Sequence, residues 1–156
     1  MSVKKSFSLT SSIESQATVI TISGPIDETA VFAEFRNEGS VKVDLGGVTR
    51  INSVGMRAWC LWLQRFREPA NVVLINCPVV MVKNFATVRG FLTDRCRVFS
   101  FAVPFYSELT GERKDFMATW GEDFSKGSIK LPKMKDSEGN TMELDVPESY
   151  FGFLKA

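Results

Sequence analysis

The sequence contains no histidine, only three cysteines in 156 residues, and no apolar run long enough to span a membrane. Without histidine, Ser-His-Asp and Cys-His catalysis are excluded, as are most catalytic zinc sites. The cysteines Cys60, Cys77 and Cys96 lie far apart in apolar segments. We therefore expect reduced, buried thiols in a cytoplasmic protein.

The chain also lacks a strong charge of either sign. Its 19 Lys and Arg residues nearly balance 18 Asp and Glu residues, for a formal net charge of +1. We therefore expect neither nucleic acid nor a membrane as a partner. No motif pairs the carboxylates, and Gly46-Gly47 matches neither the phosphate-loop nor the dinucleotide-binding pattern. These absences predict a protein with no enzymatic activity, no cofactor and no metal.

The residues that are present indicate a folded α/β domain. Hydrophobic residues make up 44% of the chain and include 13 Phe and 3 Trp, which is typical of a well-filled core. Apolar and alternating runs predict strands at residues 6–10, 17–23, 41–45, 48–51, 71–76 and 97–103. Helical spacing predicts helices at residues 27–37, 53–66 and 78–92. The resulting order, β-β-α-β-α-β-α-β, predicts a mixed sheet with helices packed on it over residues 1–103.

The segment from Val41 to Phe66 is central to this interpretation. A strand that is expected to turn at Gly46-Gly47 leads to Asn52-Ser53, and both of these residues suit a helix N-cap. One helical face carries Met56, Trp59, Leu63 and Phe66. We expect Trp59 to be in the core and Trp62, on a different face, to be partly exposed, or the reverse. A serine at this helix start lies where the helix dipole favours negative charge, so Ser53 is a candidate phosphorylation site.

The residues Asn52-Ser53-Val54-Gly55 between this strand and helix resemble the signature loop of STAS domains. That family includes anti-sigma factor antagonists and the cytosolic domains of sulfate transporters. In the antagonists the loop usually reads Asp-Ser-Ser/Thr-Gly, and a partner kinase phosphorylates the serine after the acid. Ser53 and Gly55 match this pattern, whereas Asn52 replaces the acid and Val54 replaces the second hydroxyl residue. The resemblance implies a STAS-like fold and a bacterial signalling protein that binds a kinase-like anti-sigma factor or another signalling partner.

Two interpretations of Ser53 remain open. As an N-cap it would contribute roughly 0.5–2 kcal/mol of helix stability and nothing else. As a phosphorylation site it would carry about two negative charges, which would pair with nearby arginines or displace them from a partner. The predicted interaction loop consists of Arg50, Asn52, Ser53, Val54, Gly55 and Arg57.

Residues 104–156 do not continue the alternation and predict a small β-rich appendage. Ser107-x-x-Thr110-Gly111 and Lys135-x-x-Glu138-Gly139 have the layout of two zinc knuckles. This tail resembles a zinc ribbon whose four cysteines have become Ser107, Thr110, Lys135 and Glu138. Without thiolates we expect no structural zinc, so the aromatic residues of the tail must pack on the first domain or on a partner.

These patterns favour a regulatory protein-interaction module that associates reversibly with a signalling partner. The alternative is a constitutive scaffold that self-associates, for example as a homodimer, through its sheet edge and aromatic tail. An enzyme or a small-ligand binder using a cleft near Ser53 is the third hypothesis.

Overall fold

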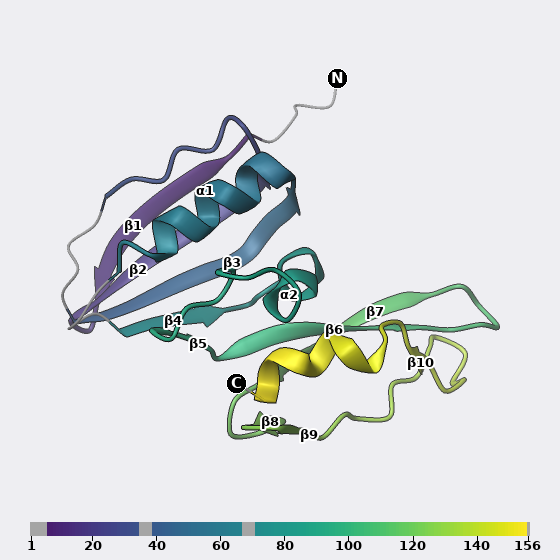
Figure 1. Cartoon of the computed structure of the whole chain (residues 1–156). Helices are drawn as coiled ribbons and strands as arrows, with labels where there is room; N and C mark the ends of the chain where they lie inside the picture. Colours follow the sequence, from purple (N-terminus) through teal and green to yellow (C-terminus); the bar gives the residue numbers. More distant parts are fainter. Residues whose placement is uncertain (1–5, 35–38, 67–70, 156) are drawn as a thin grey trace.

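A computed structural model describes residues 6–34, 39–66 and 71–155, and within them the secondary structure is mixed α/β (Figure 1). These residues form a five-stranded, a three-stranded and a two-stranded sheet, two α-helices and a 3-10 helix. No helix in this part of the chain is both long and apolar enough to cross a membrane.

The five-stranded sheet has its strands in sequence order. They are β1 (Ser8–Glu14), β2 (Ala17–Ile26), β3 (Ser40–Ile51), β4 (Asn71–Ile75) and β5 (Cys96–Val98). β1 is antiparallel to β2, and the other neighbouring strands are parallel. Along β2 and β3, buried Ile20, Ile22, Val41 and Val43 alternate with exposed Thr21 and Lys42. This alternation gives the sheet one core face and one open face.

β3 is continuous where the sequence predicted two strands separated by a turn. Thr21 pairs with Asp44 and Ser23 pairs with Gly47, so β3 has one extra residue here, bulges at Leu45-Gly46 and then continues. A side chain on Gly47 would lie 2.7 Å from the Ser23 Cβ, which explains the glycine at this close approach of the strands.

Helices α1 (Ser53–Leu63) and α2 (Val79–Phe85) pack on the core face of the sheet. Phe91 joins them, because its ring contacts both Trp59 of α1 and Phe85 of α2. α2 follows Pro78 as predicted but ends at Phe85, earlier than the predicted Leu92. Residues 86–90 form turns and a bend, and Gly90 among them has a φ of 85°, a left-handed conformation that a helix running through to Leu92 could not contain.

Residues 27–34 are not helical, so the helix predicted at 27–37 is wrong over this range, and its last three residues lie outside the described part. The Asp27 carboxylate accepts hydrogen bonds from the backbone N–H of Thr29 at 2.9 Å and from its hydroxyl at 2.6 Å. Such a local turn competes with the first turn of a helix.

Phe32 packs this non-helical segment against α1. Its ring centroid is 5.2 Å from that of Trp62 and 6.4 Å from that of Trp59, and the Trp62 indole N–H donates to the Ala33 carbonyl. Both tryptophans are buried, with 0% and 2% exposure, so the prediction that one is partly exposed is wrong. The segment at 27–34 therefore covers the face of α1 that carries Trp62.

The strand predicted at residues 97–103 divides at Phe99. β5 ends at Val98, and β6 (Ser100–Tyr106) joins the second sheet between β10 (Glu143–Leu144) and β7 (Arg113–Thr119). The Ser100 hydroxyl accepts the Asn76 backbone N–H at 2.7 Å, which ties β6 to the end of β4. The boundary predicted between residues 103 and 104 therefore falls inside β6.

The tail continues through β8 (Phe124–Ser125), β9 (Ser128–Ile129) and β10 to the 3-10 helix η1 (Glu148–Lys155). Phe101 of β6 contacts the rings of Phe124, Tyr150, Phe151 and Phe153. Phe153 also reaches Phe85 of α2, with ring centroids 5.4 Å apart. One hydrophobic core thus extends from the five-stranded sheet into the tail.

Replacing Phe32 with Ala should lower the free energy of unfolding by about 2 kcal/mol, because the two tryptophans would lose their cover. Urea unfolding followed by tryptophan fluorescence measures this loss. The matched control is Val31→Ala, whose side chain is 75% exposed and whose change should stay within about 0.5 kcal/mol. Equal effects of the two substitutions would contradict the role given to Phe32.

Candidate functional site

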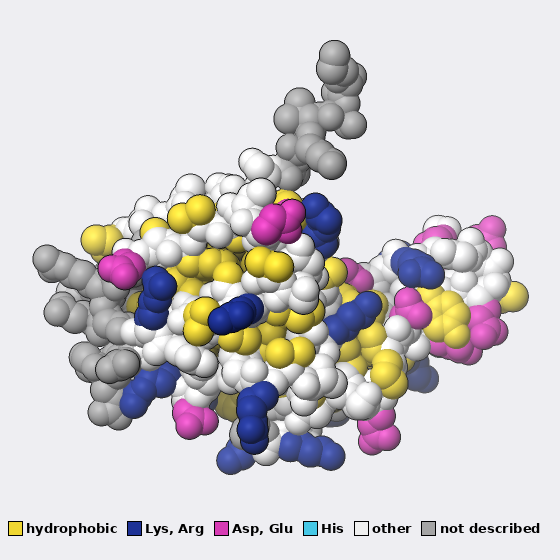
Figure 2. Space-filling view, turned by 45° about the horizontal axis from the view of Figure 1, so that its top comes forward, with side chains coloured by type: hydrophobic (Ala, Val, Ile, Leu, Met, Phe, Trp, Pro, Cys, Tyr) yellow, Lys and Arg dark blue, Asp and Glu magenta, His cyan; other side chains and the backbone are white. Residues whose placement is uncertain are grey.

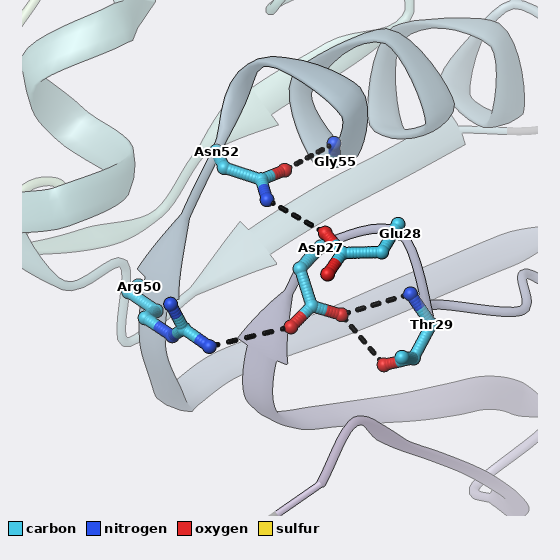
Figure 3. Close-up of polar contacts among 6 residues, drawn as sticks. All are labelled: Asp27, Glu28, Thr29, Arg50, Asn52 and Gly55. Carbon is cyan, nitrogen blue, oxygen red and sulfur yellow. Dashed lines mark hydrogen bonds and ion pairs between the residues drawn. The ribbon is translucent and has the colours of Figure 1, made fainter.

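The corner between β3 and α1 is built on Asn52. Its backbone is extended, with φ −105° and ψ 179°, and its side-chain oxygen accepts the Gly55 N–H at 2.9 Å. This confirms Asn52 as the N-cap. The Asn52 amide nitrogen donates to the Glu28 carboxylate at 2.9 Å (Figure 3). The Asn52 backbone N–H donates to the Ile26 carbonyl.

Gly55 is buried where the first turn of α1 meets the end of β2. A Cβ atom built on Gly55 would lie 1.8 Å from the Ile26 carbonyl oxygen, far inside contact distance. Only glycine therefore allows the helix to start this close to the strand. The position of Ser53 in space depends on this contact.

The carboxylates of Asp27 and Glu28 lie beside the corner. The sequence interpretation missed their part in the site because it placed both residues in a helix. The Asp27 carboxylate also faces Arg50, whose Nη2 lies 3.4 Å away (Figure 3). Hydrogen bonds from Thr29, with a smaller contribution from Arg50, lower the pKa of Asp27. The Glu28 backbone N–H and then the Asn52 amide lower the pKa of Glu28. The sequence did contain a signal for this placement. β2 and β3 are neighbouring parallel strands, so the residues that follow them, Asp27-Glu28 and Asn52, are expected at the same edge of the sheet.

Ser53 and Val54 lie at the surface of this corner. Ser53 is exposed, and the Val54 side chain retains 55% of its accessible area. Arg57, one helical turn after Ser53, is also exposed, and the Arg50 side chain is 66% exposed. The six predicted interaction-loop residues therefore lie around one corner, with Gly55 buried beneath the others.

The helices beside this corner carry an uneven charge. Residues 51–66 and 76–93, which we call the helical layer, contain no Asp or Glu. Their basic residues are Arg57, Arg65, Lys83 and Arg89. Leu61, on the outer side of α1, is 50% exposed. Figure 2 shows hydrophobic side chains interspersed with Lys and Arg over the middle of this face.

The two predicted knuckle turns of the tail do meet, but around a residue that the zinc-ribbon pattern did not select. Asp136, 5% exposed, accepts hydrogen bonds from the hydroxyls of Ser107 at 2.6 Å and Thr110 at 3.3 Å. Lys135 instead donates to the Thr141 hydroxyl, and Glu138 contributes only its backbone N–H to Asp136. A carboxylate therefore joins the turns.

The Asp136 carboxylate is fully engaged by donors from its own turn as well. The backbone N–H groups of Glu138 and Asn140 donate to one oxygen, and the Asn140 amide donates to the other. The Ser107 hydroxyl contributes most to holding the pKa of Asp136 well below its usual range. In the described part of the chain, no group of three or more Cys, Asp or Glu residues is arranged to hold a metal ion.

Gly55→Ala should destabilise the protein by about 3 kcal/mol, because the new methyl group overlaps the Ile26 carbonyl. Chemical denaturation measures the change. Val54→Ala is the neighbouring control and should cost less than about 1 kcal/mol, since Val54 is largely exposed. A stable Gly55→Ala variant with native spectra would contradict the tight contact.

Asp136 should make the stability of the tail sensitive to acid. Because its folded-state pKa is depressed below the ordinary value of 3.8, its contribution is present above that value and lost as the pH falls below it. Asp136→Asn should therefore lower the urea midpoint at neutral pH and flatten its decline in acid. Glu138→Gln, next to the same turn, is the control and should leave the pH profile unchanged. Parallel profiles of Asp136→Asn and the native protein would contradict this role.

The corner offers an exposed hydroxyl at a helix start, ionised carboxylates on one side and arginines on the other. That arrangement suits recognition of the corner by another molecule, and a change of charge at Ser53 would alter such recognition. No family model, curated protein or solved structure matches the chain.

Proposed function

We propose that this chain is a STAS-like regulatory module without enzymatic activity, which binds a signalling protein through the Ser53 corner and the helical layer. The single observation that carries the proposal is the exposure of Ser53 and Val54 on a corner fixed by the buried Gly55. A preformed, rigid recognition surface lowers the entropy that binding must overcome.

The helical layer supports a partner surface that is acidic and partly aliphatic. Val54 and Leu61 supply exposed apolar area, and Arg57 lies between them on the same helix. The layer has no carboxylate of its own, and although Arg65 lies 3.8 Å from Glu34, its four basic residues give it a net positive charge that would attract acidic surfaces and repel basic ones. Charge complementarity of this kind acts mainly on specificity and on the rate of association.

A phosphate on Ser53 would work as an off switch for such a partner. It would add about two negative charges at the edge of the basic surface, where the helix N-terminus stabilises them. Arg57, four residues along the helix, would pair with the phosphate and no longer be available to an acidic partner. Asp27 and Glu28, already ionised beside the corner, would add to the repulsion.

A constitutive scaffold is the second candidate, and β1 is the observation that favours it. This strand lies at the edge of the five-stranded sheet, is mostly exposed, and carries Ile13 with 81% of its area accessible. An exposed edge strand can pair with the same strand of a second copy. Self-association by this route would not depend on Ser53.

Ser53→Asp should weaken partner binding by about tenfold or more, whereas Ser53→Ala should bind like the native protein. A partner isolated from a native cell extract by the unmodified chain is then titrated with each variant by calorimetry. Ser149→Asp, which adds the same charge at an exposed serine of the tail, is the matched control and should not alter affinity.

Equal affinities of Ser53→Asp and Ser53→Ala would rule out the switch. Light scattering of the same samples separates the scaffold, which would be oligomeric in every variant. Mass spectrometry of the protein purified from its own cells shows whether Ser53 carries phosphate.

A further inference from the structure

A cleft of about 550 Å³ lies between the five-stranded sheet and the tail, away from the Ser53 corner. One wall comes from residues 92–94 and from 96–98, the residues of β5. The other wall comes from Trp120, Phe124 and Lys126 of the tail and from Phe153 and Leu154 of η1. Its volume is within the range of about 300–1,000 Å³ that is usual for small-molecule sites, and sites of this kind often form between structural units.

About half of the residues that line the cleft are apolar or aromatic. Its lining includes Leu92, Val98, Phe124, Phe153 and Leu154. Phe124 and Phe153 belong to the aromatic cluster around Phe101, so their rings are held in place by neighbours. This lining favours a ligand with a compact apolar group, and aromatic rings suit it well.

The charged residues that line the cleft favour an anion. Arg97 and Lys126 contribute two positive charges, and Asp94 contributes one negative charge. The Arg97 guanidinium lies 5.4 Å from the ring centroid of Trp120, whose side chain is 38% exposed. Within the described part of the chain, neither Arg97 nor Lys126 forms a salt bridge.

The cation–π contact with Trp120 positions Arg97 without using its N–H donors as hydrogen bonds. The guanidinium therefore keeps N–H donors that match the two oxygens of a carboxylate. Asp94 in the same lining opposes a second negative charge, which favours a monoanion over a phosphate dianion.

We propose that this cleft binds a small aromatic monocarboxylate. The ring lies on the apolar lining, and the carboxylate is held by the Arg97 guanidinium with Lys126 nearby. Such a ligand would contact both the sheet and the tail, and would therefore stabilise their packing in proportion to its affinity. This site does not involve Ser53, so a test of ligand binding here is independent of the test of the proposed protein partner.

The test is an NMR titration of the full chain with 1-naphthylacetate and, in parallel, with the uncharged 1-naphthylacetamide. The chain has three indole N–H signals, and Trp120→Phe identifies one of them. Those of Trp59 and Trp62 are held in hydrogen bonds to Phe91 and Ala33, so only the Trp120 signal should move. The carboxylate should bind about tenfold more tightly than the amide, because only the carboxylate can form charge-assisted hydrogen bonds with Arg97.

Arg97→Gln should remove this preference and leave the weak binding of the amide unchanged. Arg113→Gln is the matched control, because Arg113 is an exposed arginine on β7 outside the cleft. Three results would overturn the proposal. They are equal affinity for acid and amide, the same loss in both arginine variants, and no shift of the Trp120 signal at millimolar ligand.

Discussion

The contact between Gly55 and the Ile26 carbonyl governs the geometry of the candidate site. The same carbonyl accepts the Asn52 N–H, so one oxygen at the end of β2 fixes both the N-cap and the first turn of α1. Ser53 lies between these two anchored residues and has little freedom to move with the chain. Its exposed side chain therefore starts from a fixed backbone position at the surface. A partner that distinguishes phosphorylated from unphosphorylated Ser53 needs this side chain at a fixed position.

The distribution of charge matters more here than its total. A formal net charge of +1 gives no reason to expect electrostatic recognition, yet the helical layer contains four basic residues and no acid. The acidic residues of the corner, Asp27 and Glu28, lie on the preceding loop and border the layer without entering it. Folding thus separates charges that are mixed along the chain. That separation gives one face of a nearly neutral protein a preference among partners.

Local patterns predicted the parts of the fold that depend on local physics. The positions of β2 and β4, both halves of β3 and the start of α1 follow from apolar and alternating runs and from the capping chemistry of Asn52, although the continuity of β3 through Gly46-Gly47 does not. The non-helical segment at 27–34 did not, because its conformation depends on the contact between Phe32 and Trp62, thirty residues later in the chain. The division at Phe99 likewise depends on a distant bond between Ser100 and Asn76. For the tail, the cysteine spacing of a zinc ribbon indicated Lys135 and Glu138, whereas a carboxylate that joins two turns by hydrogen bonds follows no such spacing.

β6 has a further consequence for how the molecule unfolds. It begins beside the end of β4, carries Phe101 into the aromatic cluster, and forms the middle strand of the second sheet. Neither half of the protein can come apart without exposing rings that belong to the other. The chain should therefore melt as one cooperative unit, and evolution could not discard the tail without rebuilding the interior of the α/β unit.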